Sequence, residues 1–135
     1  MSITAIEAAL EQKLLAVADL PAIAWEDVSY KPTTGQPYLK VHHLHNNPRD
    51  LFMERGPAEL PGIFQVSVLY PAGRGKVEAK QLAERIADAF APVQMLPAGN
   101  HRVDLLDTPA IASGFPDDEG WYVVPVSISW QAFPV

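Results

Sequence analysis

The residues best suited to chemistry in this chain are histidines that gather in one short segment. His42, His43 and His45 fall within Tyr38–His45, and His101 lies further along the chain. Residues two apart on a strand share a face, so His43 and His45 have a spacing that metal sites use. The chain has no cysteine, and no Asp or Glu stands beside these histidines on the segment. A solvated strand end leading into a loop accounts for the cluster, and we predict no physiological metal site.

A second candidate is the glycine-rich stretch from Gly73 to Lys76, which lies between a strand-like and a helix-like segment. This layout is also that of phosphate-binding loops. The Walker pattern fails because Tyr70 stands where its first glycine is required, and because Val77 replaces the magnesium-binding Ser or Thr. The dinucleotide fingerprint fails because Glu78 stands at its third glycine position. We therefore expect an ordinary turn and no cofactor.

The acidic residues form no recognisable acid/base pair. Asp117, Asp118 and Glu119 are a charge run in a predicted turn, which is typical of a solvated tip. Asp104 and Asp107 would join them only through a coincidence of folding that the sequence does not show. The chain has no G-x-S-x-G motif, and the absence of cysteine excludes thiolate ligands and a cysteine nucleophile. We therefore predict that the chain is not an enzyme.

Length and composition fit one globular domain, which we expect to span residues 1–135. Of the 135 residues, 48% are hydrophobic and 19% are charged, so the chain can bury a real core. The formal net charge is −6 and no basic block occurs. A dedicated nucleic-acid surface needs clustered Lys and Arg, so we expect no recognition of DNA or RNA.

Nothing in the sequence favours a membrane or export. No run approaches the roughly 18 apolar residues that would span a bilayer. The N-terminal segment carries Glu7 and Glu11 and lacks the basic start of a signal peptide. We therefore expect a protein that is assembled in the cytoplasm and has no membrane partner.

The elements that must position these residues are organised around Gly62–Phe90. Hydrophobic alternation from Ile63 to Tyr70 predicts a strand with one buried side. Pro71 ends this strand, because proline cannot donate to the next rung of the ladder. Beyond the glycine turn the hydrophobic period becomes about 3.6, which predicts a helix that Pro92 stops. The expected buried residues are Phe64, Val66, Val68 and Tyr70 on the strand, and Val77, Leu82, Ile86 and Phe90 on the helix.

The remaining segments supply another helix and more strands. Apolar residues spaced three and four apart predict a first helix over residues 3–18. We predict further strands at residues 23–25 with an extension toward Tyr30, and at 38–45, 103–106, 110–112 and 121–133. Residues 31–37 and 46–61 are predicted loops. Pro125 indicates an edge or a bulge in the last strand, because proline interrupts a ladder.

The predicted order of elements is α-β-β-β-α-β-β-β. A sheet with one apolar face must be covered, so we predict an α+β fold with two helices packed on one face of a mostly antiparallel mixed sheet. We expect Trp25, Trp121 and Trp130 to pack in the core or at its edge, not to form a ligand platform.

The order of these segments resembles that of the phage tail terminator-like family of long-tailed phages and prophages. The resemblance is carried by GIFQVSVLYPAGRGKVEAKQLAERIADAF, AIAWEDVSYKPTTGQPYLKVHHLHNNP and GFPDDEGWYVVPVSISW, and it includes the N-terminal helix. It covers nearly the whole chain. No single motif in it is catalytic or unique, and its specificity lies in the order of the segments.

This resemblance implies a structural role without catalytic chemistry. Members form a ring, typically hexameric, on the head-proximal end of the finished tail tube, where it stops tube polymerisation and offers a surface to head-completion proteins. The implied partners are the tail tube protein, head-completion or neck proteins and further copies of the chain. The implied location is the virion tail, assembled in the host cytoplasm. An isolated monomer that assembles only on the tube end is compatible with this role.

The predicted loop HLHNNPRDLFMERGPAELPG is variable in the family, so the resemblance does not assign its contacts. A loop this long in a compact domain is usually functional or mobile. We hypothesise that Arg49–Arg55 reaches a neighbouring subunit or the tube end, with Phe52 and Met53 as apolar anchors. A merely mobile loop explains the composition equally well. The candidate interface residues are Arg49, Leu51, Phe52, Met53, Glu54 and Arg55.

Two other classes of function stay open. One is a different neck or head-tail completion protein, which is similar in size and also forms rings. The other is a metal-dependent enzyme that uses the histidine cluster.

Overall fold

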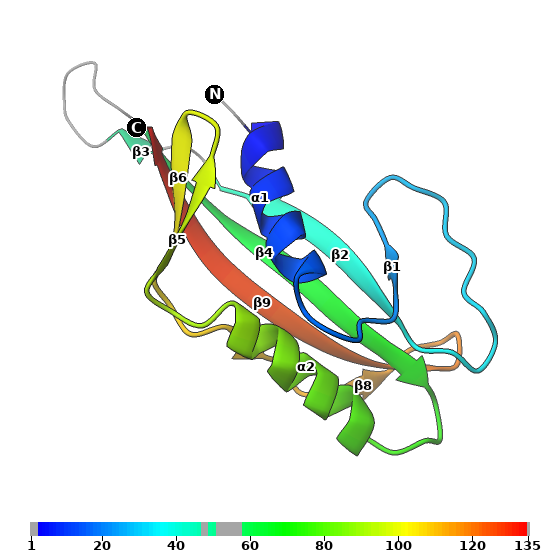
Figure 1. Ribbon diagram of the computed structural model, residues 1–135. Coiled ribbons are helices and arrows are strands. Elements are labelled where there is room, and N and C mark those ends of the chain that lie inside the picture. Colours follow the sequence, from blue (N-terminus) through cyan, green and yellow to red (C-terminus); the bar gives the residue numbers. More distant parts are fainter. Residues whose placement is uncertain (1–2, 47–48, 51–57, 135) are drawn as a thin grey trace.

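Two helices lie over one face of a long, twisted sheet in the computed structural model of this chain (Figure 1). The structure describes residues 3–46, 49–50 and 58–134. Its elements are α1 (Ile3–Leu15), β1 (Ala22–Ala24), β2 (Tyr38–His45), β3 (Arg49–Asp50), β4 (Ala58–Pro71), α2 (Val77–Ala89), β5 (Gln94–Ala98), β6 (His101–Leu105), β7 (Ala110–Ile111), β8 (Phe115–Pro116) and β9 (Trp121–Pro134). Neither described helix is long and apolar enough to cross a membrane.

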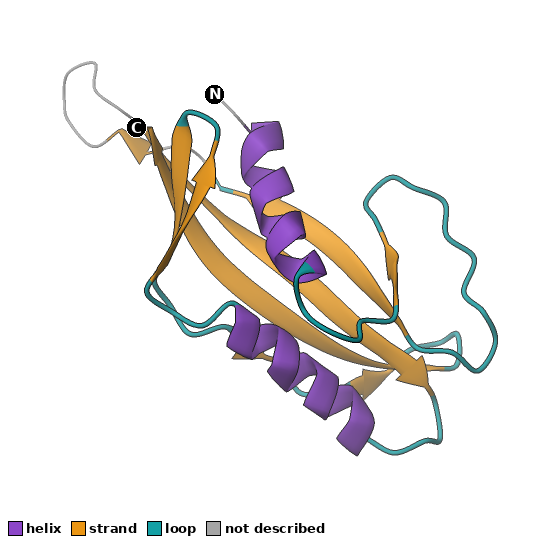
Figure 2. Cartoon of the chain, viewed as in Figure 1, coloured by secondary structure: helices purple, strands orange, loops and turns teal. Residues whose placement is uncertain are grey.

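The sheet is mixed but almost wholly antiparallel. Its strands follow the order β1-β2-β4-β9-β6-β5, and among the strands that the structure describes only the pair β1–β2 is parallel. The short strand β3 pairs with β4, while β7 and β8 pair with β9 beyond the reach of β6 (Figure 2). The predicted α+β architecture is therefore confirmed, and the short strands β3, β5 and β8 add to the predicted order.

The two longest strands, β4 and β9, form the centre of the sheet. Their ladder is continuous from Leu60 opposite Ala132 to Pro71 opposite Trp121. Alternate residues of β4 point to the helix side and are fully buried as far as Val68, while Gln65 and Ser67 on the other side are half-buried. The buried residues of this alternation are Phe64, Val66 and Val68. Two residues predicted to be buried are not: Tyr70 is half-buried near the end of β4, and Val77 in the first turn of α2 is 61% exposed.

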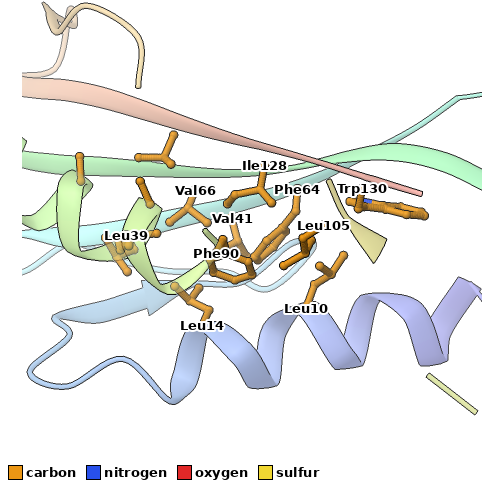
Figure 3. Packing of buried hydrophobic residues seen from close by; sticks show 14 of the residues in the cluster. Leu10, Leu14, Leu39, Val41, Phe64, Val66, Phe90, Leu105, Ile128 and Trp130 are labelled. Atoms are coloured by element: carbon orange, nitrogen blue, oxygen red, sulfur yellow. The ribbon is translucent and has the colours of Figure 1, made fainter. Parts of the chain in front are cut away.

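The core lies between this face of the sheet and the helices. Ile6, Leu10 and Leu14 place a single apolar stripe of α1 against it, and none of the three is exposed. Each such side chain contributes roughly 1.5–3 kcal/mol by leaving water. Leu10 and Leu14 extend from α1 toward Phe90 and Leu105 in Figure 3. The buried residues of α2 are Ala79, Leu82, Ala83, Ile86 and Ala87.

Neither of the two described helices covers the opposite face of the sheet (Figure 1). An antiparallel sheet tolerates this arrangement because one face can remain solvated. Near one end of this face Tyr38, Leu69 and Val123 form a small second cluster with Ala24. Trp121 packs on this cluster, with its ring edge-on to Tyr38 at a centroid distance of 5.0 Å.

Several predicted boundaries are wrong. The strand predicted at residues 23–25 does not extend toward Tyr30, because β1 ends at Ala24. The loop predicted over residues 46–61 is shorter, because β4 begins at Ala58 and Pro61 lies inside it opposite Gln131. The carbonyl of Pro61 accepts a hydrogen bond from the Asn46 N–H, so the proline nitrogen also faces Asn46, just past the end of β2, and the ladder with β9 loses no hydrogen bond. Helix α1 ends at Leu15, three residues earlier than predicted, because an i to i−3 hydrogen bond from Val17 N–H to the Leu14 carbonyl tightens the last turn.

The prediction of an edge or a bulge at Pro125 is right in part, because there is no bulge but the side of β9 away from β4 has no paired residue from a described strand at Pro125. Pro125 pairs with Ser67 of β4 in an uninterrupted register, and β7 and β8 flank β9 on its other side. The Pro125 carbonyl accepts a hydrogen bond from Ala112 N–H at 2.9 Å on that other side. The N and C=O of one strand residue point the same way, so the missing N–H faces the gap between β7 and β8. The ladder with β4 therefore loses no hydrogen bond.

Candidate functional site

The predicted interface residues begin where β3 pairs with β4. Arg49 stands opposite Glu59 and Asp50 opposite Ala58 in an antiparallel pair. The remaining candidates lie in the connection between these two strands and fall outside the described residues; they are Leu51, Phe52, Met53, Glu54 and Arg55. Their role at a subunit or tube interface stays a prediction.

One end of the molecule gathers segments that are far apart in the sequence, and we call it the β3 end. It comprises β3, the start of α1, the turn between β5 and β6, and the last residues of β9 (Figure 1). His101 of β6 pairs with Pro134 of β9 there. A Cβ on Gly99 of the turn would lie 3.5 Å from the Cβ of Ala5 in α1. Ile3 is 40% exposed at this end.

The histidines of β2 meet carboxylates of α1. His43 Nε2 lies 2.8 Å from Oε2 of Glu11, and His45 Nε2 lies 2.6 Å from Oε2 of Glu7. We call Glu7, Glu11, His43 and His45 the histidine–carboxylate cluster. It forms because residues four apart on a helix and two apart on a strand each share a face. The cluster holds α1 against β2 through polar contacts beside the apolar stripe.

His43 is the buried member of the histidine–carboxylate cluster. Its side chain is 2% exposed, and its ring stacks on Phe64 at a centroid distance of 4.7 Å. Nδ1 of this ring is buried and has no hydrogen-bond partner among the described residues. A neutral ring that donates from Nε2 to Glu11 therefore leaves Nδ1 as a buried acceptor without a donor.

The other two histidines do not join this cluster. His42 points to the opposite face, where Nδ1 lies 3.3 Å from Oε1 of Glu26 and the side chain is 57% exposed. The same carboxylate oxygen accepts a hydrogen bond from the backbone N–H of His43. His101 stands on β6, which β4 and β9 separate from β2. The structure thus brings together only His43 and His45 of the four.

The glycine stretch of the β4–α2 connection is a turn, and the backbone conformation of the turn favours glycine at both positions. Gly73 and Gly75 have φ of +91° and +84°, a region that L side chains rarely adopt. Arg74 between them donates to the carbonyl of Gly35 at 3.3 Å and so ties two loops together. Helix α2 then starts at Val77, after the N-cap residue Lys76, which makes no side-chain cap hydrogen bond, and Glu78 lies in its first turn. That carboxylate complements the helix dipole.

The acidic groups lie at opposite ends of β9. Asp104 pairs with Gln131 near one end and binds Arg102 through both of its carboxylate oxygens, at 2.8 and 3.1 Å. Asp117 lies near the other end, where Oδ1 accepts hydrogen bonds from the backbone N–H groups of Glu119 and Trp121. The fold therefore does not bring Asp104 close enough to Asp117 to form an acid/base pair.

The tryptophans pack as predicted. Trp130 is 2% exposed in the main core, Trp25 is packed against that core, and Trp121 belongs to the smaller cluster on the other face. Trp130 Nε1 is buried and has no hydrogen-bond partner among the described residues.

Sequence reasoning missed the contribution of Glu7 and Glu11, because it looked for carboxylates only beside the histidines. Two signals point to them. Each follows a residue of the buried α1 stripe, Ile6 and Leu10, so both lie on the flank of that stripe. His43 shares the apolar face of β2, and a buried polar ring requires a polar partner from the covering helix.

Comparisons with known proteins identify the fold and the family. A family model described as phage tail terminator protein matches residues 5–130. A solved structure whose title names no function shares 25% identity, with a TM-score of 0.74 over 98% of this chain and 96% of its own. The solved structure titled "Virion of native gene transfer agent (GTA) particle" contains a similar chain with 19% identity, a TM-score of 0.70, and coverage of 98% and 97%. No curated protein matches.

The family match runs from α1 to Trp130 near the end of β9, and it therefore includes both helices and all the central strands. The chain belongs to the phage tail terminator protein family.

Proposed function

We propose that this chain closes into a ring on the head-proximal end of a phage tail tube, stops tube polymerisation and presents the surface to which the head joins. The observation that carries the proposal is the family match over residues 5–130. The similar chain in a gene transfer agent virion supports a place in a phage-like particle. The partners are the tail tube protein, head-completion proteins and other copies of the chain, and the role needs no catalysis.

The two edges of the sheet disfavour open-ended growth by strand addition and are therefore compatible with a closed ring of subunits. A free strand edge invites addition of further strands. On the β2 edge, the Glu26 carboxylate accepts the backbone N–H of His43 beyond the end of β1. On the other edge, β5 contains Pro97, which has no N–H to offer. Both features blunt open-ended strand addition and favour contacts through loops and faces, such as a closed ring requires.

The β3 end offers such contacts. Strands β3 and β4, which flank Leu51–Arg55 in the sequence, pair with each other at this end. An apolar anchor such as Phe52 or Met53 fits the pattern of interfaces, in which a few buried apolar residues supply most of the affinity. We therefore place the contact to the tube rim or the neighbouring subunit at the β3 end. A hexameric ring is the expected stoichiometry.

The proposal is tested by locating the protein within the particle. Electron cryomicroscopy of purified virions should show one ring of this fold between the last ring of tube subunits and the neck. Density one layer further toward the head would instead indicate a different neck or head-completion protein. Absence of the chain from intact particles would contradict both assignments.

A further inference from the structure

We propose that Glu7, Glu11 and His43 form a binding site for a divalent transition-metal ion, for which Zn²⁺ is the probe. His45 positions Glu7 in this site. Nothing in the tail role requires such an ion, so the inference stands or fails independently of the proposed function.

The sites of the three ligands are set by regular structure. Glu7 and Glu11 are four apart on α1 and face the sheet, while His43 faces them from β2. Their ligand atoms all lie within 4.8 Å of one another. Ligands on a helix and a strand are held more firmly than ligands on loops, because packing fixes the backbone of both elements.

The ligand atoms are close enough together for a metal ion to bind all three after small shifts. Zn²⁺ binds carboxylate oxygen and imidazole nitrogen at about 2.0–2.2 Å, so neighbouring ligand atoms in a tetrahedral site lie about 3.3 Å apart. The His43 Nε2–Glu11 Oε2 separation of 2.8 Å must open slightly, and the longest separation must close. Both adjustments are within the freedom of glutamate side chains. Three protein ligands leave a fourth position for water.

The donor set and its surroundings favour a cation. Two carboxylates converge at a half-buried place, where their side chains are 29% and 32% exposed, and a dication relieves their mutual repulsion. Imidazole with carboxylate suits Zn²⁺ and its first-row neighbours better than Mg²⁺ or Ca²⁺, which favour all-oxygen sites. His45 Nε2 lies 2.6 Å from Oε2 of Glu7 and holds that carboxylate, as outer partners of metal ligands do.

The hydrogen bond between His43 and Glu11 must break before a metal ion can bind. The strength of this competition depends on the proton positions of the His43 ring. Without metal, Nε2–H donates to Glu11. With metal, Nε2 coordinates through its lone pair and the proton moves to Nδ1. No described residue bonds Nδ1, so its burial costs stability in both forms and does not oppose the exchange. A ligand histidine without a partner for its other nitrogen binds metal less tightly, so we expect a Kd on the order of micromolar.

The first experiment is a calorimetric titration of the chelator-treated chain with Zn²⁺ at neutral pH. We expect one saturable site per chain and a rise in Tm with added Zn²⁺. Glu11→Gln preserves the size and polarity of the side chain but removes its charge, and it should weaken binding at least about tenfold. Glu84→Gln, on α2, and His42→Gln, at an exposed position on the other face, should bind like the unaltered chain.

A second measurement needs no variant and covers the case in which Glu11→Gln impairs folding. Paramagnetic Co²⁺ added to the unaltered chain should broaden amide resonances around the middle of α1 and the end of β2. Broadening centred elsewhere, binding that Glu11→Gln leaves unchanged, or the lack of saturable one-to-one Zn²⁺ binding would overturn the site.

Discussion

Trp130 lies directly opposite Gly62 in the β4–β9 ladder, and its ring fills the space that a side chain at position 62 would occupy. A Cβ on Gly62 would lie 2.3 Å from Cζ2 of Trp130 and 2.9 Å from the carbonyl oxygen of Leu44. The indole is 2% exposed, and the edge of its ring system approaches His45 at a centroid distance of 5.6 Å. Trp130, the largest fully buried side chain of the core, therefore packs directly on the backbone of Gly62.

Gly62→Ala should lower the free energy of unfolding by about 2 kcal/mol, because overpacking at a close contact forces buried groups to move. The added Cβ would meet the buried ring of Trp130 and the backbone carbonyl of Leu44, and neither group can move away without a cost in free energy. Urea unfolding followed by fluorescence measures the change.

The matched control for this substitution is a double-mutant cycle with Trp130→Phe. The smaller ring no longer occupies the space beside position 62, so the cost of Gly62→Ala should fall by roughly 1 kcal/mol or more in that background. An equal cost in both backgrounds would show that the contact is not the cause.

Tyr38→Phe should change the response of stability to alkaline pH. Burial raises the pKa of the Tyr38 hydroxyl above its usual 10.0, and the negative charges of Asp117 and Glu119 raise this pKa further. The folded state therefore holds the proton more tightly than the unfolded chain. The stabilisation that results is fully present below pH 10 and is lost as pH rises through the higher folded-state pKa.

The variant keeps the ring that packs on Trp121 but has no proton to lose. Unfolding midpoints measured at intervals from pH 8 to above pH 10 should fall less steeply for Tyr38→Phe than for the unaltered chain. Parallel curves over the whole range would contradict the assignment.

The pair Arg102–Asp104 should respond unequally to loss of its two members. Asp104 is the buried partner, with a side chain 10% exposed, and Arg102 is the accessible one at 45%. Arg102→Met leaves the buried carboxylate of Asp104 without its partner and with little access to water. Asp104→Asn leaves the Arg102 guanidinium at a position where water can solvate it. We expect Arg102→Met to cost about 2 kcal/mol and Asp104→Asn about 1 kcal/mol.

Chemical denaturation of both variants at neutral pH measures these costs. The reverse order would mean that burial of the carboxylate does not govern the pair. Arg102 also lies over the ring of Phe133, at 5.9 Å from its centroid, so a Met that retains the apolar stem is the appropriate replacement.

The local hydrophobic pattern was sufficient to predict those strands whose main requirement is the burial of one apolar face. The strand Tyr38–His45 and the buried alternation Phe64, Val66 and Val68 follow from a single apolar face, and the structure confirms both. Strand β5 escaped prediction because its side chains are half-exposed and it contains Pro97, which suits an edge strand but looks like a turn in sequence.

The site was less predictable than the fold, because its members come from separate elements. The pairing of Glu11 with His43 depends on where α1 lies across β2, and neither segment alone encodes that crossing. The same holds for Glu26, which reaches the edge of β2 only after β1 has paired with it in parallel. Such contacts across the fold follow from tertiary packing, which periodicity does not describe.

Replacement of Leu51, Phe52 and Met53 by serine should impair capping of tails without unfolding the chain. If these residues anchor the ring on the tube rim or on a neighbour, loss of their apolar area removes the centre of that interface. Complementation of a phage that lacks the gene, scored by plaque titre and tail length, is the measurement.

The matched control changes three exposed apolar residues elsewhere in the chain, Leu15, Val28 and Val77, at 58%, 60% and 61% exposure. The control triple should complement normally. Normal capping by the Leu51, Phe52 and Met53 triple would refute the proposed anchors and leave the family role intact.

The length distribution of tails made without this protein tests the proposed terminator role most directly. The gene is deleted in its phage or prophage, tails are imaged by electron microscopy, and the chain is supplied from a plasmid as a control. A terminator ring predicts tails of excessive and variable length that lack heads, with normal particles restored by the plasmid. Tails of normal length joined to capsids in the deletion strain would contradict the account.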